Sequence, residues 1–98
     1  MTLPIRFRPI AQAEFDAAVA WYEQARPGLG ADFAAEVEAV LAEAARAPNR
    51  FPVVDGDVRE GPVRGFPYCA YYRVRAGRVV VVGVYHQARD PSGWRGRV

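Results

Sequence analysis

The spacing of apolar residues predicts two consecutive helices in the first half of the chain. In the segment that starts at Pro9, apolar side chains recur every three or four residues up to about Ala25. The same spacing returns after a turn at residues 26–30, which is rich in Pro and Gly, and it continues to Pro48. Such a period places the apolar residues on one face of a helix. The short connection between the two segments predicts a helical hairpin.

The second half of the chain shows the pattern of strands. Two apolar runs rich in Val and Tyr, residues 66–74 and 79–86, flank a short polar segment that contains Ala76 and Gly77. β-Branched and aromatic runs on either side of a glycine turn predict a β-hairpin. The hairpin ends in a segment that carries several arginines and the single histidine of the chain.

Three further segments are predicted to be short or irregular. Residues 4–8 alternate apolar and basic side chains, as an edge strand does. Residues 57–63 are predicted as a strand that a Gly-Pro pair weakens, so we expect it to bulge or to lie at an edge. Residues 51–54 are expected to form a loop or a short extended piece, because a proline in this segment cannot donate to a ladder.

Together these elements predict one α+β domain over residues 1–98 with the order β-α-α-β-β-β. We expect the helical hairpin to pack on one face of a small, mainly antiparallel sheet. The acidic residues of both helices, Glu14 and Glu23 among them, are expected to form solvated faces, since nothing apolar is placed to raise a carboxyl pKa. A chain of 98 residues is long enough for one hydrophobic core.

The composition limits the cellular setting. No apolar run approaches the ~20 residues that cross a bilayer, and we expect no signal peptide. A single Cys cannot form an intramolecular disulfide, so we expect a protein of the reducing cytoplasm. One Cys and one His do not make a zinc site without many carboxylate ligands. We therefore expect neither a metal nor a cofactor.

The register of the predicted hairpin assigns its side chains to two faces. If the turn is centred on Ala76 and Gly77, Arg73 lies opposite Val80, and cross-strand partners share a face. One face is then uncharged and is expected to form the core. It holds Tyr68, Ala70, Tyr72, Val74, Val79, Val81, Gly83 and Tyr85. The small pair that Ala70 makes with Gly83 is expected to let a helix approach closely.

The opposite face of the hairpin is apolar in the centre and charged at its rim. A surface of this kind is a candidate site for a partner segment. The candidate residues are Tyr71, Arg73, Arg75, Val80, Val82, Val84 and His86. Coverage by the C-terminal tail through Trp94 is an equally good alternative.

Charge is distributed unevenly along the chain. The formal net charge is +2, but residues 1–49 carry four Arg against seven acidic residues, and residues 50–98 carry nine Arg against four. This asymmetry indicates an acidic partner for the second half, either a phosphate backbone or an acidic protein segment. All thirteen basic residues are Arg, whose planar fork suits both phosphate and carboxylate, although a GC-rich genome would produce the same bias.

Several polar residues in and around the hairpin suggest RNA cleavage. Attack by a 2′-hydroxyl requires a proton acceptor, a proton donor and cations that stabilise the phosphate in the transition state. The candidates for these roles are His86, Arg89, Arg73, Arg59 and Tyr68. The alternative is that His86 is a structural residue at a strand end. Cys69 and His86 are expected on one face as diagonal neighbours roughly 7–8 Å apart, which is too far for a nucleophilic pair.

Short motifs spread over nearly the whole chain resemble one known family. They are Ala13 through Trp21-Tyr22-Glu23, Pro27-Gly28-Leu29-Gly30 with Phe33 and Glu36-Val37, Pro48 with Phe51-Pro52, Val58-Arg59, Phe66-Pro67-Tyr68, Tyr71-Tyr72-Arg73, and His86 with Arg89-Asp90-Pro91 and Trp94. In this combination they are similar to the RelE/ParE toxins of bacterial type II toxin–antitoxin modules, also called plasmid stabilization proteins. The resemblance implies a fold that agrees with the predicted order of elements.

The resemblance also implies partners. An antitoxin that wraps such a toxin with an extended or helical segment would occupy the mixed sheet face. RelE-like members resemble ribosome-dependent mRNA endonucleases, whereas ParE-like members poison DNA gyrase. The segments Trp21-Tyr22-Glu23 and Phe66-Pro67-Tyr68 are more similar to the ParE side, and the absence of Lys departs from the RelE endonucleases. Gyrase is therefore the preferred target.

Two alternatives remain open at this point. In an mRNA endonuclease acting on the ribosome, three arginines would hold phosphate and His86 would move the proton. These arginines are Arg59, Arg73 and Arg89. The chain would otherwise be an inactive homologue that only binds an antitoxin or nucleic acid. Whether the protein is an enzyme depends on this choice.

Overall fold

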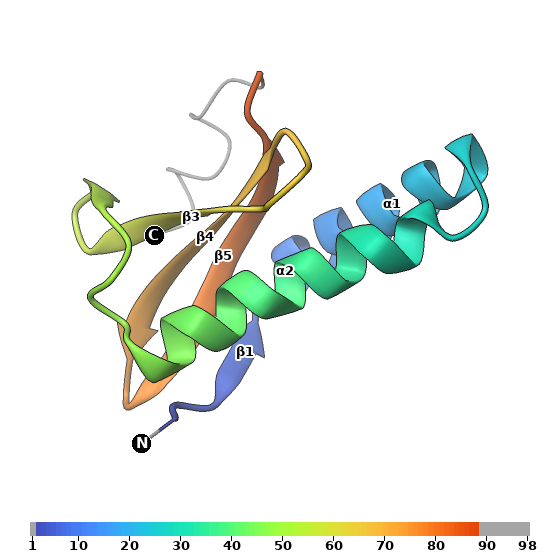
Figure 1. Cartoon of the computed structure of the whole chain (residues 1–98). Coiled ribbons are helices and arrows are strands. Elements are labelled where there is room, and N and C mark those ends of the chain that lie inside the picture. Colours follow the sequence, from blue (N-terminus) through green and yellow to red (C-terminus); the bar gives the residue numbers. More distant parts are fainter. Residues whose placement is uncertain (1, 89–98) are drawn as a thin grey trace.

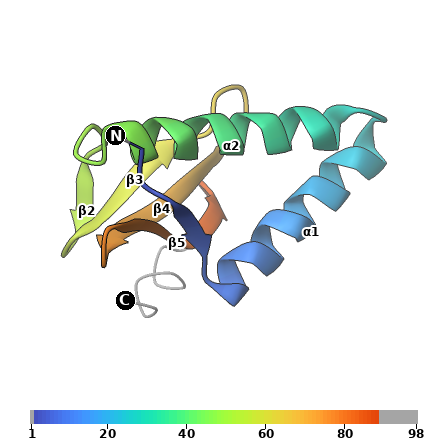
Figure 2. The same cartoon turned by 90° about the horizontal axis from the view of Figure 1, so that it is seen from below.

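Two helices cover one face of a five-stranded sheet in the computed structural model, which describes residues 2–88 (Figure 1). The elements are β1 (Ile5–Phe7), α1 (Pro9–Ala25), α2 (Leu29–Arg46), β2 (Val53–Asp55), β3 (Val58–Pro62), β4 (Tyr68–Arg75) and β5 (Arg78–His86). The strand order is β1-β5-β4-β3-β2. β1 pairs with β5 in parallel, and the other neighbouring strands pair antiparallel. In Figure 2 the helices diverge from their connection, and α1 leads back to the edge strand β1.

The predicted α+β architecture is confirmed, with one more strand than expected. Residues 51–54 were expected to be a loop or a short extended piece, and their last two residues begin β2, which pairs with β3 at the sheet edge. Pro52 lies just before this strand, where its missing N–H does no harm. Its carbonyl instead accepts a hydrogen bond from the Glu60 N–H at 3.0 Å. The order after the helices is therefore four strands rather than three.

The connection between the helices depends on a residue that was expected to be solvated. Gly28, the N-cap of α2, has no side chain and adopts a φ of 89°. Glu23 of α1 replaces the missing cap, because its carboxylate accepts hydrogen bonds from the N–H groups of Gly28 at 2.9 Å and Gly30 at 3.0 Å. A Cβ at Gly30 would lie 2.6 Å from the Val19 carbonyl oxygen. The close approach of the two helices therefore requires glycine here.

Apolar clusters lie on both faces of the sheet, and a smaller one around Tyr72 and Val79 lies beside the larger cluster on the helix side. The larger cluster, between helices and sheet, includes Phe33 and Val37 of α2, which are fully buried. Aromatic rings extend this cluster, since Phe33 contacts Phe66 and Tyr68 with ring centroids 5.1 and 5.0 Å apart. A second cluster lies on the other face, which we call the far face. Its buried members are Val58, Cys69, Tyr71, Val82 and Tyr85.

The hairpin of β4 and β5 has the predicted turn. Ala76 and Gly77 have φ angles of 52° and 73°, so both lie in the left-handed region that two-residue hairpin turns favour. Next to the turn, Arg73 lies opposite Val80 as expected. Beyond Tyr72 the register shifts by one residue, because a bulge inserts an additional residue into β5.

This bulge corrects the predicted faces of the distal half of β5, whereas the residues of β4 lie on the faces predicted for them. Val84 joins the cluster beneath the helices, whereas Tyr85 belongs to the far face. His86 pairs with Tyr68, and Cys69 pairs with Tyr85, so Cys69 and His86 lie on opposite faces rather than on one. Because the additional residue lies in β5, the residues of that strand beyond it exchange faces.

The point of closest helix approach also differs from the prediction. Gly83 pairs with Tyr71 and not, as predicted, with Ala70. Ala70 pairs with Val84 of β5 and, on its other side, with Gly61 of β3. A Cβ added at Gly61 would lie 2.8 Å from Val40 Cγ2 of α2. The helix therefore approaches the sheet over Gly61 and Ala70.

Candidate functional site

Helix α1 carries a second apolar stripe that the sequence interpretation did not identify. Ile10 and Trp21 remain 48% and 64% exposed, and both are large apolar side chains. Their spacing, with Ala13 and Ala17 between them, places all four on one side of the helix. The residues that pack into the core follow a different stripe of the same helix. A second helical period was visible in the sequence, but it was not separated from the first.

This stripe forms one wall of an apolar groove of about 800 Å³. The other wall comes from the segment before β4 and from the distal end of the hairpin. The groove is lined by Ile10, Ala13, Glu14, Ala17, Ala18, Trp21, Tyr22, Pro67, Tyr68, Val84 and His86. Small alanine side chains lie between two large exposed ones, which leaves room for the apolar face of another helix.

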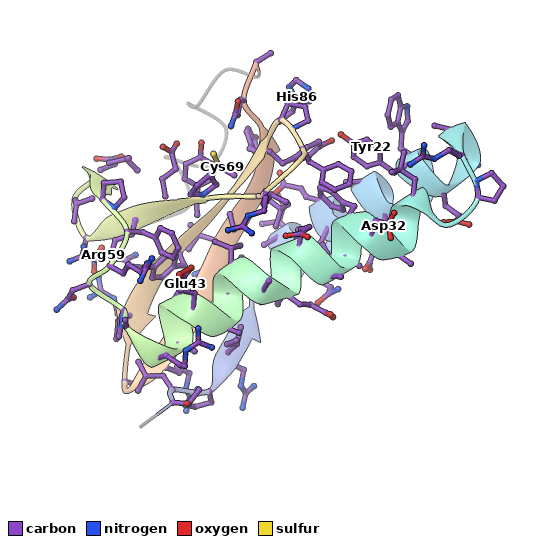
Figure 3. All side chains as sticks on the ribbon, viewed as in Figure 1. Tyr22, Asp32, Glu43, Arg59, Cys69 and His86 are labelled. Atoms are coloured by element: carbon purple, nitrogen blue, oxygen red, sulfur yellow. The ribbon has the colours of Figure 1, made fainter. Side chains whose placement is uncertain are left out.

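Aromatic rings in edge-to-face contact build the end of the groove near His86. The centroid of the Tyr68 ring lies 5.2 Å from that of the His86 ring and 6.0 Å from that of the Tyr22 ring, and both contacts are edge to face. Trp21 meets Tyr22 at 5.1 Å in the same manner. Burial, and then the neighbouring Tyr68, raise the pKa of Tyr22, so its phenol stays neutral. Figure 3 shows Tyr22 and His86 on the same side of the molecule.

Glu14 is the acidic residue of the groove lining, and it has a structural role. Its Oε1 accepts a hydrogen bond from the Val84 N–H at 3.1 Å. β1 ends opposite Val81, so beyond this point β5 has no strand neighbour on that side. Glu14 satisfies a backbone donor there that would otherwise be buried without a partner. This contact fixes α1 against β5 and corrects the expectation that Glu14 belongs to a solvated face.

The arginines proposed for phosphate binding hold the protein's own groups. Arg59 donates to the carbonyl oxygens of Phe51 at 2.7 Å and Asn49 at 3.3 Å. These bonds tie β3 to the segment that follows α2. Arg73 forms an ion pair with Asp57 at 2.8 Å, and its side chain is 15% exposed. Arg89 lies outside the described residues.

The candidates for RNA cleavage do not converge on one site. Tyr68 and His86 are paired neighbours at one end of the sheet, and the His86 Nδ1 accepts a hydrogen bond from the Ala88 N–H at 3.0 Å. Arg73 lies next to the turn at the other end and on the opposite face. Figure 3 shows Arg59 far from His86 as well. Stabilisation of a phosphate requires cations and a proton carrier within hydrogen-bond reach of the same group, and these residues do not provide that geometry.

The predicted partner face is divided by the bulge. Tyr71, Arg73, Arg75, Val80 and Val82 share the far face, whereas Val84 and His86 line the groove. The apolar centre of the far face is buried, with Tyr71 at 7% and Val82 at 0% exposure. Tyr71 donates to Glu60 Oε2 at 2.8 Å, and burial followed by this contact strongly raises its pKa. Coverage of this face through Trp94 concerns a residue outside the described range.

Two further findings concern the range 2–88. No group of three or more His, Cys, Asp or Glu residues in this range is placed to hold a metal ion. No helix there is long and apolar enough to cross a membrane.

Comparisons with known proteins agree with this fold. A chain of a solved structure described as a chromosomal ParDE TA system from P. aeruginosa superposes with a TM-score of 0.74. It is 16% identical in sequence, and the match covers 87% of this chain and 96% of that chain. At this identity the likeness establishes the fold alone. No curated protein matches the chain significantly. Residues 5–91 match the model of the ParE toxin of type II toxin–antitoxin systems, parDE, and the chain therefore belongs to the ParE toxin family.

Proposed function

We propose that this ParE-family toxin acts in the cytoplasm by binding DNA gyrase, and that a cognate antitoxin neutralises it by seating a segment in the α1 groove. The observation that carries the proposal is the groove, where Ile10 and Trp21 present large apolar side chains to solvent. Exposed aromatic anchors of this kind are typical of protein–protein interfaces, where the few residues that dominate the binding energy are enriched in Trp and Tyr.

The preference for gyrase over RNA is supported by the geometry of the nuclease candidates. Arg59 and Arg73 are engaged with Phe51 and Asp57, and neither lies near His86. A toxin that acts by binding a protein does not need a proton carrier and cations placed around one phosphate group. The family match to ParE toxins supports the same choice.

The segment that would occupy the groove is best described as an amphipathic helix. The groove runs along α1 from Ile10 to Trp21, a distance of about three turns or ~16 Å at 1.5 Å per residue. A partner helix would place apolar residues at positions i, i+3, i+4 and i+7 against this wall. Ala13 and Ala17 would allow the two helix backbones to approach closely.

The target is tested with the purified full chain, gyrase and plasmid DNA. We expect the toxin to increase the fraction of plasmid that gyrase leaves cleaved, and we expect a ribosome-bound mRNA to stay intact. The variant His86→Ala should retain this effect within about twofold, because a histidine that does not take part in chemistry contributes nothing to a transition state.

The same choice is tested in cells that produce the toxin without an antitoxin. The proposal predicts a DNA damage response with intact transcripts. Rapid transcript cleavage without a DNA damage response would reject gyrase as the target, and so would loss of toxicity in a folded His86→Ala variant.

A further inference from the structure

Four arginines gather on the far face, at the end of the sheet that carries the β4–β5 turn. Arg6 of β1 is aligned with Val80 of β5, and Val80 is aligned with Arg73 of β4. In the next row Arg75 lies opposite Arg78. Aligned residues share a face, and so do residues two apart on one strand. We call Arg6, Arg73, Arg75 and Arg78 the basic end of the far face.

One carboxylate already shows how this basic end binds an acidic group. Asp57, in the turn between β2 and β3, contacts Arg73 Nη2 through Oδ1 at 2.8 Å and Arg75 Nη1 through Oδ2 at 3.0 Å. The side chain of Asp57 remains 43% exposed, and that of Arg75 remains 58% exposed. Within residues 2–88, the ion pairs of this cluster involve Asp57 alone, while Arg6 and Arg78 are exposed and have no carboxylate partner there.

We propose that the basic end of the far face binds an acidic, extended polypeptide segment, with Asp57 occupying in the free protein the place of one of the segment's carboxylates. The planar guanidinium groups of arginine pair with carboxylates in a fixed geometry, as Arg73 and Arg75 do here. At their backbones the two rows of arginines are about 6–7 Å apart, which equals the spacing of alternate residues in an extended chain. Alternating acidic residues would therefore match the rows.

An acidic polypeptide fits this surface better than a nucleic acid does. The basic end has four arginines, and Asp57 offsets one positive charge. A nucleic-acid interface gains affinity with each phosphate that it neutralises, and this patch has few positive charges to offer for that purpose. The site is distinct from the α1 groove, which is apolar and lies on the helix side of the sheet. A partner at the basic end would bind there whether or not gyrase is the target of the toxin.

Fluorescence anisotropy with a fluorescein-labelled octaglutamate peptide tests the proposal on the full chain. We expect the wild-type protein to bind the peptide at low salt and to lose affinity as salt screens the charges. The double substitution Arg6→Ala and Arg78→Ala should weaken binding at least tenfold. Asp57→Asn, which removes the internal competitor but keeps the shape of the side chain, should strengthen binding about threefold or more.

A matched control separates this site from general attraction by positive charge. Arg26 is exposed in the connection between the helices, and Arg26→Ala should change peptide affinity by less than twofold. The C-terminal arginines are present in every variant, so any attraction they exert on the peptide cancels when the variants are compared. Arg78→Lys keeps the charge but removes the planar guanidinium group. Provided that thermal unfolding shows a retained fold, its affinity for the peptide should lie between those of the wild type and the double variant.

Four outcomes would overturn the proposal. They are no binding of octaglutamate at low salt, equal weakening by Arg26→Ala, weaker rather than stronger binding by Asp57→Asn, and tighter binding of a labelled 12-base-pair duplex than of the peptide. The last outcome would assign the surface to nucleic acid instead.

Discussion

The α1 groove and the basic end of the far face are two candidate docking surfaces built in different ways. The groove is apolar and joins α1 to the distal half of the hairpin, which is some sixty residues away in sequence. The basic end depends on the strand register next to a tight turn and on one exposed carboxylate. A partner in the groove would gain affinity from buried area, whereas a partner at the basic end would gain it from charge that salt screens. One surface therefore depends on tertiary packing, and the other mainly on pairing in the sheet.

The largest effect is expected where the groove depends on close helix packing. Gly30→Val would drive a side chain into the Val19 carbonyl, which lies 2.6 Å from an ideal Cβ. We expect the free energy of unfolding to fall by about 3 kcal/mol, because the backbone of α1 must shift. Chemical denaturation measures this change. Ala31→Val, at the exposed neighbouring position, should cost less than about 0.7 kcal/mol, and equal costs would contradict the packing argument.

Substitution of the exposed tryptophan should separate binding from stability. Trp21→Ala should leave the melting temperature nearly unchanged, since the side chain is 64% exposed. It should weaken binding of the cognate antitoxin by about 2 kcal/mol, or roughly 30-fold, as loss of an interface anchor does. Isothermal titration calorimetry of the wild type and the variant with the antitoxin measures the affinity, and scanning calorimetry measures the melting temperatures. The substitution Arg78→Ala, at the other surface, should leave groove binding within a factor of two at moderate salt, and a comparable loss would mean that the surfaces are not separate.

The hydrogen bond that fixes α1 to β5 should have an intermediate effect. Glu14→Ala leaves the Val84 N–H without its acceptor, and we expect a loss of about 1–3 kcal/mol in the free energy of unfolding. Glu14→Gln retains an acceptor oxygen and should lose less than half as much. Hydrogen exchange of the Val84 amide, followed by NMR, measures the local consequence. Equal losses for the two variants would show that the charge, and not the hydrogen bond, stabilises this contact.

Near the basic end, a substitution in the β4–β5 turn is expected to stabilise the protein slightly. Ala76 has a φ of 52°, which costs a residue with a Cβ about 1 kcal/mol. Ala76→Gly should therefore stabilise the protein by somewhat less than this amount, because glycine also gains entropy in the unfolded chain. Gly77→Ala, the matched change at the next position, should destabilise it. Thermal unfolding compares the two, and a loss of stability in Ala76→Gly would reject the assignment of strain to this turn.

The smallest effect concerns the buried thiol of the far face. Burial, followed by the nearby Glu60, raises the pKa of Cys69. The unfolded chain thus releases the thiol proton more readily than the native protein does. The stability that the native protein gains from keeping the thiol neutral is fully present below the ordinary thiol pKa, and it is lost as pH rises above that value. At pH 8 the native protein should react with a thiol reagent at least tenfold more slowly than the denatured chain. Equal rates would show that the far face is open to solvent.

The features that sequence patterns predicted well are those with a clear period. The helical stripes gave α1 its limits at Pro9 and Ala25, because proline marks a first turn and apolar residues recur at helical spacing. The turn at Ala76 and Gly77 was predicted from its flanking strands, and the register next to it was correct. The distal register was wrong, since residues 79–82 are all valine and provide no alternation that would reveal a bulge.

The candidate sites were predicted less completely. Tyr68 and His86 were predicted on opposite faces of the hairpin, but they pair with each other and line the groove, away from Arg73. Arg59 is of a residue type that often binds phosphate, yet its N–H groups donate to backbone carbonyl groups of the segment after α2. Such roles depend on how neighbouring segments pack, which the pattern of one segment does not show. The groove itself was missed, although Ile10 and Trp21 signalled a second apolar stripe.

By itself, the sequence determined the helices, the hairpin turn, the α+β class and the family, because each follows from local periods or from short motifs in a fixed order. The tertiary structure decided which residues share a surface. The bulge in β5 moved Val84 and His86 beneath the helices, and the close packing at Gly30 set the position of α1. A face of a strand reverses with a shift of one residue, and a groove exists only between segments already placed by packing. Local pattern therefore predicted the elements, while long-range packing produced the surfaces on which the proposed function depends.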